Sequence, residues 1–384
     1  MKNFSLKIWQ FILICLAVII IMFVLNPVAF SHESFFLFLV SVAGGGFLLF
    51  FRNKFKYLNN KTNSTLIILV IILFVALFAP IIVIYEPGQI LNAGECKLLP
   101  PFSKKVILYK RNEGIQKSEF EKIVADSFKV KENIVVYRKS RIVELEKNMV
   151  LLEGGSPKVQ KALFILGTDE LGRDLFSRVI YGTRLSLTIG FSSTFFSMVI
   201  SFLFAFASFS RSRFLDFIAN RTSEIFLAIP SLFVIIFAIS FFGNNLFSVI
   251  LMLAITSWMS LFKILNGEIK RIVYKDFIVS SKMLGISKNK IFFREIIPLI
   301  LPSIIVNMIF QIANFIIIES SLSFLGLGPG GDYVSWGSII ESGTTYLSDA
   351  WWLILFPGVF LFFTIVALNK TGIKLEKYFN PLVR

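Results

Sequence analysis

Long apolar runs with at most one charged residue each constrain this chain more than any other feature of its sequence. A hydrocarbon core about 30 Å thick is crossed by roughly 20 helical residues. We predict eight spans, near 8–25, 35–51, 65–85, 184–209, 225–242, 246–265, 300–320 and 351–369. The second and fifth are short enough to be tilted or re-entrant. Because 55% of the residues are hydrophobic and 45 are Phe, one soluble core could not bury them. The predicted fold is an all-α polytopic membrane protein.

The positions of Lys and Arg predict how the spans are oriented. Basic residues cluster after the second, fourth and sixth runs and at both ends of the chain, whereas the short loops NPVAFSHES, FGNN and GPGGDYVSWGSIIESGTTYLSDA contain none. Short basic loops stay in the cytoplasm, so both termini are predicted to be cytoplasmic. Segment 86–183 is basic but must lie outside, where long domains are carried regardless of charge. This distribution accounts for the net charge of +15 without a nucleic-acid partner.

The composition of the apolar and polar stretches predicts the domain organisation. The loop NPVAFSHES is a poor cleavage site, so the first run is predicted to be a retained span and not a signal peptide. After the third span, KKVILYK, NIVVYR, RIVELEK and MVLLEG predict a small β-rich insert, and 154–157 a linker. This insert either binds a ligand or acts as a spacer. The predicted divisions are a two-span hairpin at 1–63, a first core span at 64–85, the extracytoplasmic insert at 86–160, and a transmembrane domain at 161–384 with a cytoplasmic loop at 266–299.

A polar stretch before the fourth span, LGTDELGRDLFSRVIYG, contains apolar residues at helical spacing. It predicts an amphipathic elbow helix in the outer membrane interface, which Thr168 or Asp169 can cap. The alternative is a helix start with surface ion pairs. The residues of this outer elbow motif are Gly167, Thr168, Asp169, Gly172, Arg173 and Asp174.

Two charged residues are predicted to lie at membrane depth. Charges there are costly and usually face a cavity or a partner. Glu319 either lines a pathway or is an interfacial carboxylate, and these alternatives stay open. Lys263, near the inner end of the sixth span, is predicted to extend its ammonium group to the inner surface.

The loop between the sixth and seventh spans predicts two short amphipathic helices broken at Gly285, within KDFIVSSKMLGISKNKIFFREIIPLILPS. Such a helix–Gly–helix element could be gripped by a cytoplasmic motor. The alternative is a basic amphipathic helix on anionic lipid. Periodicity alone does not separate these two interpretations.

Groups that carry enzymatic chemistry are scarce. His32 is the only histidine, so metal sites or triads based on His cannot be assembled. The phosphate-loop pattern GxxxxGK[ST] does not occur. Cys15 lies inside a span and Cys96 outside, which implies no disulfide framework. We predict that the chain is not an enzyme and binds no cofactor, so that any ATP is hydrolysed by another chain.

Several motifs in order resemble one family. GTDELGRDLFSRVIYGTRLSL, ESSLSFLGLG at 319–328, SWG at 335–337 and LFPG at 355–358 resemble the second permease, the oligopeptide/dipeptide permease C type, of the dipeptide/oligopeptide/nickel ABC importers. The resemblance covers about 65–90 and 160–384. Gly285 resembles the glycine of the family's cytoplasmic motif, but Val279, Ser280 and Ser281 replace its Glu-Ala-Ala triplet. That replacement puts a salt bridge to the ATPase in doubt.

The resemblance implies a multi-pass permease of the bacterial inner membrane with a six-helix type I importer domain. Its implied partners are a second permease, two cytoplasmic ABC ATPases, an extracytoplasmic solute-binding protein and membrane lipid. The alternatives are a permease for nickel or another small solute, or a membrane sensor or scaffold whose insert binds a partner. The ATPase-coupling residues implied by the resemblance are Ser280, Ser281, Lys282, Leu284, Gly285, Ile286, Ser287, Lys288, Asn289 and Lys290.

The predicted orientation can be tested by labelling. A cysteine introduced by Ser287→Cys should resist a membrane-impermeant maleimide added to intact cells, because the Gly285 segment is predicted to face the cytoplasm. The same cysteine should react once the cells are permeabilised. Ready modification in intact cells would contradict the topology.

Overall fold

The computed structural model describes residues 63–111, 120–130, 133–138, 142–146, 149–153, 156–210, 213–330 and 333–379. The predicted spans at 8–25 and 35–51 lie outside these residues. Of the hairpin predicted at 1–63, only residue 63 is described. The chain divides into two compact units. The helical unit comprises Met1–Leu77, Arg184–Gly331 and Phe362–Arg384, and the mixed unit comprises Phe78–Thr183 and Asp332–Leu361.

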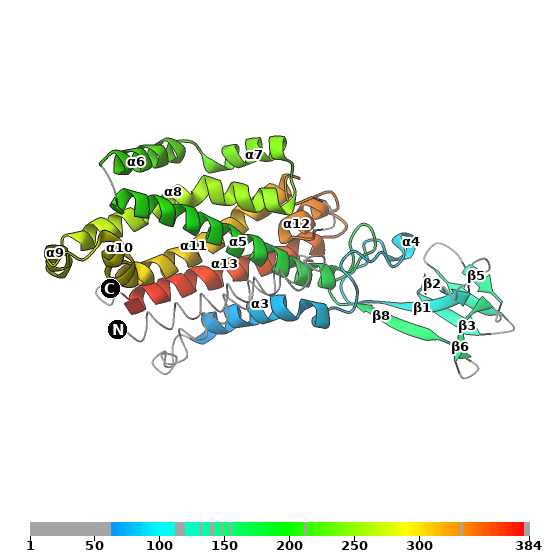
Figure 1. Cartoon of the computed structure of the whole chain (residues 1–384). Coiled ribbons are helices and arrows are strands. Elements are labelled where there is room, and N and C mark those ends of the chain that lie inside the picture. Colours follow the sequence, from blue (N-terminus) through cyan, green and yellow to red (C-terminus); the bar gives the residue numbers. More distant parts are fainter. Residues whose placement is uncertain are drawn as a thin grey trace. The chain divides into compact units, whose positions relative to one another are not determined.

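Helices make up most of the described chain (Figure 1). The longer helices are α3 (Asn63–Ile82), α5 (Leu175–Ser210), α6 (Arg213–Ala228), α7 (Ser231–Phe242), α8 (Leu246–Val273), α11 (Ile297–Phe324) and α13 (Trp352–Phe379). The shorter ones are α4 (Ala93–Cys96), α9 (Asp276–Met283), α10 (Lys288–Ile291), the π-helix η3 (Phe292–Ile296) and α12 (Trp336–Thr344).

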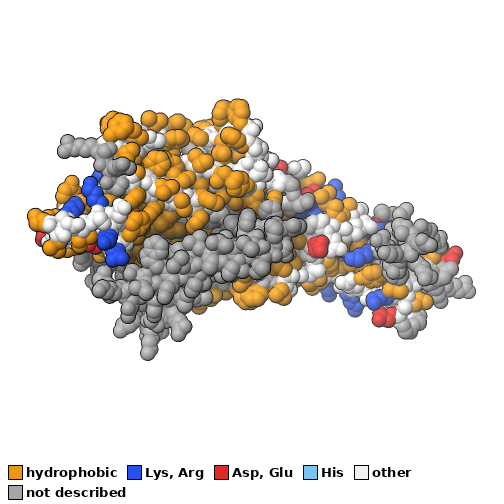
Figure 2. Space-filling view, in the orientation of Figure 1, with side chains coloured by type: hydrophobic (Ala, Val, Ile, Leu, Met, Phe, Trp, Pro, Cys, Tyr) orange, Lys and Arg blue, Asp and Glu red, His pale blue; other side chains and the backbone are white. Residues whose placement is uncertain are grey.

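Four helical stretches of the described residues are long and apolar enough to cross a membrane: Leu175–Phe209, Leu246–Val273, Lys288–Phe324 and Trp352–Phe379. They confirm the spans predicted at 184–209, 246–265, 300–320 and 351–369. The third predicted span corresponds to α3, whose apolar part, Ile67–Ile82, is shorter. Figure 2 shows hydrophobic side chains gathered over the part of this face where Figure 1 places α6, α7 and α8, as expected for surfaces that face lipid or another subunit.

The span predicted at 225–242, which was expected to be tilted or re-entrant, is divided between two helices. The chain breaks between Ala228 and Ser231, and the segments Phe214–Ala228 and Ser231–Phe242 meet at 88°. Pro230 lies at the break with φ −60° and an extended ψ of 118°. Proline has no N–H and disfavours helical geometry in the preceding residue, so the helix ends there. This pair is either a broken span or a re-entrant loop.

The predicted β-rich insert is confirmed, but it ends later than expected. Its strands are β1 (Ser103–Arg111), β2 (Phe120–Ala125), β3 (Ser127–Val130), β4 (Ile134–Tyr137), β5 (Ile142–Leu145), β6 (Leu152–Glu153), β7 (Ser156–Pro157) and β8 (Val159–Phe164). They form sheets in the orders β2-β1-β8, β3-β4-β5 and β6-β7, and the pairings are antiparallel.

Strand β8 corrects the predicted boundary at 160 and the predicted linker at 154–157. Ser156 and Pro157 belong to the β6–β7 hairpin, and β8 pairs with β1 as far as Phe164. Ala162 and Phe164 point into the same core at the period of a strand, where they pack with Ile107 and Val124. The exposed Gln160 and Lys161 make this strand hard to recognise in the sequence.

Helices α5 and α11 approach closely at Gly190. A Cβ at this position would lie 3.1 Å from Ile316 Cγ1 and 3.3 Å from Ile312 O. Ser186 and Ser197 on α5 reach Glu319 and Gln311 on α11, at 3.2 and 2.8 Å. Small residues in this register let two membrane helices approach and exchange side-chain hydrogen bonds.

The α5–α11 contact predicts that substitutions at two helical glycines differ in their effect on the stability of the protein. Gly190→Leu should destabilise the protein by about 1–3 kcal/mol, because the larger side chain overpacks the α5–α11 contact. Gly267→Leu on α8 is the matched control, since a Cβ there meets nothing within 4 Å. Thermal unfolding in detergent should show a lower midpoint for the first variant only. Equal midpoints would contradict the assigned packing.

Candidate functional site

The segment around Gly285 is a helix–turn–helix whose turn satisfies its own backbone. Helix α9 ends in a Schellman motif, in which Ile286 N–H donates to Ser281 O at 3.1 Å and Gly285 N–H donates to Lys282 O at 3.1 Å. Gly285 has φ +73°, a region that residues with a Cβ rarely adopt. The predicted break at Gly285 is therefore confirmed, and its cause is a glycine helix cap.

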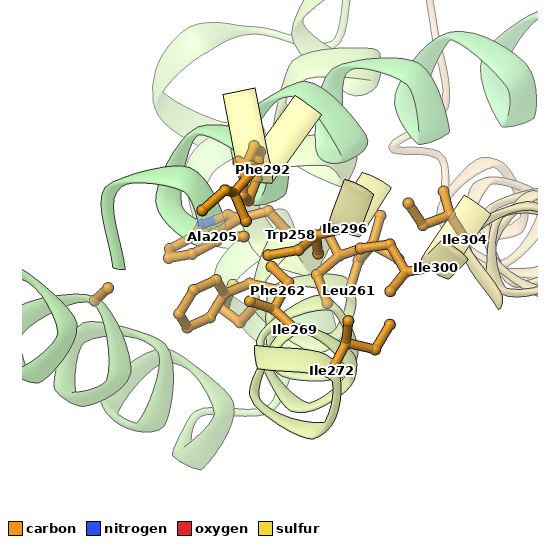
Figure 3. Close-up of a cluster of buried hydrophobic side chains, with 14 of the residues drawn as sticks. Ala205, Trp258, Leu261, Phe262, Ile269, Ile272, Phe292, Ile296, Ile300 and Ile304 are labelled. Carbon is orange, nitrogen blue, oxygen red and sulfur yellow. The ribbon is translucent and has the colours of Figure 1, made fainter. Parts of the chain in front are cut away.

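Buried side chains on both sides of the turn anchor it. Ile278 of α9, Ile291 of α10 and Phe292 of η3 are each 0% exposed. They belong to one cluster with Trp258, Phe262 and other apolar residues of α8, drawn in part in Figure 3. The Phe292 ring lies 5.5, 5.0 and 5.2 Å from the rings of Phe202, Phe206 and Phe209 on α5. This aromatic packing fixes the base of the turn against two long helices.

A polar contact also links the helical segments on the two sides of the turn. Ser281 Oγ on α9 donates to Glu295 Oε1 on η3 at 3.0 Å. In η3 the Ile297 N–H reaches back five residues, to Phe292 O. The π-helical turn directly precedes Pro298, which lacks the N–H that would continue a regular α-helix.

The tip of the turn is exposed throughout. Every residue from 282 to 290 is exposed, including Met283 at 84% and Leu284 at 79%. The predicted coupling residues thus lie together: Ser280, Lys282, Leu284, Gly285, Ile286, Ser287, Lys288, Asn289 and Lys290 are exposed, and Ser281 is half-buried. Figure 2 shows Lys and Arg side chains at the end of the molecule where Figure 1 places α9 and α10. The tip offers apolar and basic groups to a partner.

The outer elbow motif is a buried, hydrogen-bonded turn that leads into α5, so the prediction of a separate amphipathic helix is wrong. Helix α5 begins at Leu175 and continues without a break to Ser210. The interpretation as surface ion pairs is also wrong, because Thr168, Asp169 and Asp174 are 0%, 1% and 4% exposed.

Asp169 organises the turn before α5. Its Oδ1 accepts from Leu171 N and Arg173 N at 3.0 and 2.8 Å, and its Oδ2 lies 2.6 Å from Arg173 Nε and 3.3 Å from Arg178 Nε. Gly172 has φ +76°, and a Cβ there would lie 2.9 Å from Cys96 Cβ.

Asp174, and neither Thr168 nor Asp169, caps helix α5. Its Oδ2 accepts from Ser177 N and Ser177 Oγ at 2.8 and 2.6 Å. Burial raises the pKa of Asp174 above its usual value, while the hydrogen bonds from Ser177 act in the opposite direction.

Thr168 joins three segments that are far apart in the sequence. Its Oγ1 accepts from Leu99 N at 2.8 Å and donates to Cys96 O, and its backbone O accepts from Trp352 Nε1 at 3.1 Å. Gly167 lies directly against this contact, because a Cβ there would be 2.5 Å from Leu99 O. Thr168 and Asp169, with close approaches at Gly167 and Gly172, hold the segment around Leu99 against the end of the insert.

Glu319 is completely buried within the protein, so its carboxylate does not face the surface. It is 0% exposed on α11, and it accepts from Ser186 Oγ and Ser323 Oγ at 3.2 and 2.7 Å. Buried charges are tolerated when hydrogen bonds of this kind satisfy them. A role of Glu319 along a pathway stays a prediction.

A polar ladder between α6 and α8 escaped the sequence analysis. Lys263 Nζ lies 3.0 Å from Glu224 Oε1, Asn266 Nδ2 3.2 Å from Asn220 Oδ1, and Lys270 Nζ 3.3 Å from Asp216 Oδ2. Lys263 therefore contacts α6, whereas its ammonium group was expected to extend to the inner surface. The spacing of Asp216, Asn220 and Glu224, four residues apart, is the sequence signal that could have indicated this ladder.

Metal chemistry finds no support in the part of the chain that the structure describes. No group of three or more His, Cys, Asp or Glu side chains there could hold a metal ion.

Comparisons with known proteins agree with these features. The family model described as "Binding-protein-dependent transport system inner membrane component" matches residues 197–384, a range that includes the Gly285 turn and Glu319. The dipeptide transport system permease protein DppC of Bacillus subtilis (strain 168) is 33% identical over 219 residues, covering 57% of this chain and 68% of that protein. The di/tripeptide transport system permease protein DppC of Pseudomonas aeruginosa (strain UCBPP-PA14) is 32% identical over 234 residues, covering 61% and 75%.

Among solved structures, the chain is similar to an inward-facing methionine ABC transporter. The TM-score is 0.46 at 16% sequence identity, and the match covers 53% of this chain and 96% of that chain.

The hydrogen bonds of Thr168 predict how a mutation would change the reactivity of Cys96. Cys96 is 0% exposed, and burial raises the pKa of its thiol to about 11. Thr168→Val should leave the Leu99 N–H and the Cys96 carbonyl unsatisfied, at about 1–3 kcal/mol for each group. Maleimide should then modify Cys96 faster at mildly alkaline pH in a Cys15→Ser background.

Thr188→Val is the matched control, because Thr188 Oγ1 donates only within its own helix, to Arg184 O at 2.8 Å. This change should cost less than about 0.5 kcal/mol and leave the labelling rate unchanged. Equal rates for the two variants would show that Thr168 does not hold the segment containing Cys96.

Proposed function

The chain belongs to the family of binding-protein-dependent transport system inner membrane components, and from that premise we propose that it forms part of a translocation path for peptides in an ATP-driven importer. Its relatives are named as dipeptide, di/tripeptide and oligopeptide permeases, which supports peptides as the solute. The proposed partners are a second permease, two ATPase subunits and an extracytoplasmic solute-binding protein. Both termini are proposed to be cytoplasmic.

The observation that carries the proposal is the contrast between the tip and the base of the Gly285 turn. Force from a nucleotide-driven partner must reach the membrane helices through a contact that does not yield. Met283 and Leu284 are available to such a partner, whereas Ile278, Ile291 and Phe292 are buried against α8 and α5. A push on the tip is therefore delivered to two long helices.

The chemistry of the tip indicates the surface that would receive it. Lys282, Lys288 and Lys290 are exposed beside the apolar residues, and 277–293 contains no Asp or Glu. The partner surface should therefore be an apolar groove with an acidic rim. Ser281 donates to Glu295 of its own chain.

Alternating access by such a complex requires that ATP-bound partners grip one arrangement of the turn better than another. No catalytic group in this chain is needed for that, because the ATPase subunits supply the reaction. The proposed role of this subunit is mechanical: it converts closure of the ATPases into movement of α5 and α8.

Gly285→Pro should abolish the stimulation of ATP hydrolysis by solute-loaded binding protein in the reconstituted complex. Proline cannot adopt φ +73° and removes the N–H that closes the helix cap. Gly285→Ala should reduce the stimulation only in part, because a Cβ there meets no neighbour within 4 Å and costs about 1–2 kcal/mol of backbone strain.

Gly243→Pro at the end of α7 is the matched control. Gly243 has φ +79°, its N–H donates to Ile239 O, and a Cβ there also meets nothing within 4 Å. This variant carries the same backbone conflict away from the proposed contact, so it should retain stimulation. Normal coupling in Gly285→Pro, or equal loss in both variants, would overturn the proposed role of the turn.

A further inference from the structure

The base of the sheet β2-β1-β8 carries an apolar and basic patch that the proposed transport function does not use. Phe102 is 70% exposed and Leu163 is 43% exposed, and Lys104 and Lys161 beside them are also exposed. We call these four residues the basal patch. Exposed apolar side chains rimmed by polar residues often mark a surface that binds a protein or a membrane.

The strand register brings the patch residues together. Lys104 on β1 is paired with Leu163 on β8, and Val106 with Lys161, so these side chains emerge on one face of the sheet. Phe102 directly precedes β1, and its N–H donates to Phe164 O at 2.8 Å. Neither β1 nor β8 contains Asp or Glu. The patch therefore combines apolar groups with uncompensated positive charge on its own strands.

The backbone that presents Phe102 is held in an unfavourable conformation. Leu98 and Phe102 have φ of +50° and +63°, although neither is glycine. Hydrogen bonds from Leu98 N to Asp169 O at 3.0 Å and from Leu99 N to Thr168 Oγ1 at 2.8 Å fix this segment. Strain of this kind persists only where surrounding contacts impose it. Here its consequence is an aromatic ring directed to the surface.

The patch lies at the level where membrane helices end. The Phe164 ring stacks on Tyr85, three residues beyond the end of α3, at a centroid distance of 6.0 Å. Thr168, which bonds to Leu99, also accepts from Trp352, the first residue of α13. The neighbouring Trp351 is 50% exposed. Half-exposed Trp residues at the ends of spans are typical of the headgroup layer.

We propose that the basal patch binds the surface of the bilayer, with Phe102 and Leu163 inserted among lipid headgroups and Lys104 and Lys161 contacting anionic phosphates. Apolar residues flanked by Lys are the chemistry that attaches proteins to anionic lipid. The nearby helix ends favour lipid over a protein partner as the occupant. Attachment would hold the base of the insert at the bilayer surface, whichever solute is transported.

Spin labels provide the test in full-length protein reconstituted into vesicles. Phe102→Cys and Leu163→Cys are each labelled in a Cys15→Ser background, in which the buried Cys96 stays unmodified. Labels at both positions should be more accessible to oxygen than to a water-soluble nickel chelate. Ile142→Cys is the control, because Ile142 on β5 is 64% exposed but lies in the other three-stranded sheet, and its label should favour the nickel chelate.

The charge of the lipid tests the contacts of the Lys residues separately from the insertion of the apolar side chains. Vesicles that contain phosphatidylglycerol should hold the labels deeper than vesicles of phosphatidylcholine alone, and Lys104→Gln with Lys161→Gln should remove that difference. Labels at positions 102 and 163 that are as accessible to nickel as the label at 142 would overturn the proposal. Protection that arises only after the solute-binding protein is added would overturn it as well, since the patch would then be a protein-docking surface.

Discussion

Anchoring of an exposed turn by completely buried side chains is the constraint on which the rest of the helical unit depends. The cluster around Phe292 lies where α5, α8 and η3 meet, and it gives the Gly285 turn a fixed base. Close packing of this kind has few alternative arrangements, so displacement of the turn must move whole helices. The Schellman cap contributes the same rigidity from the backbone, because its two hydrogen bonds satisfy the carbonyls of Ser281 and Lys282 at the end of α9.

Hydropathy was sufficient to predict the spans that became α5, α8, α11 and α13, because each is a long apolar stretch of uniform character. It failed at Pro230, where one proline outweighs the apolar composition and divides the predicted span into α6 and α7. It also missed β8, whose inward residues Ala162 and Phe164 are separated by polar neighbours. Local pattern predicts local structure well, but a single backbone restriction or a partner strand can override it.

The contacts of the sites could not be predicted, since they join residues far apart in the chain. Thr168 and Asp169 were expected to cap a helix, which is a local role, whereas Thr168 bonds to Leu99 and Cys96 and holds the insert to the start of α5. Glu319 was recognised from its rarity at membrane depth, but its hydroxyl partner Ser186 lies on another helix. The sequence singled out these residues but did not indicate what they contact.

Replacement of the Glu-Ala-Ala triplet should reduce the free energy of the proposed docking by less than its place in the family pattern suggests. An ion pair at an exposed position contributes about 0–1 kcal/mol. Met283 and Leu284 are 84% and 79% exposed, and burying side chains of this size contributes about 1.5–3 kcal/mol each. A partner groove that covers both therefore gains more from them than it loses with the carboxylate. The shape of the turn, which depends on Gly285, then matters more than the residues that replaced the triplet.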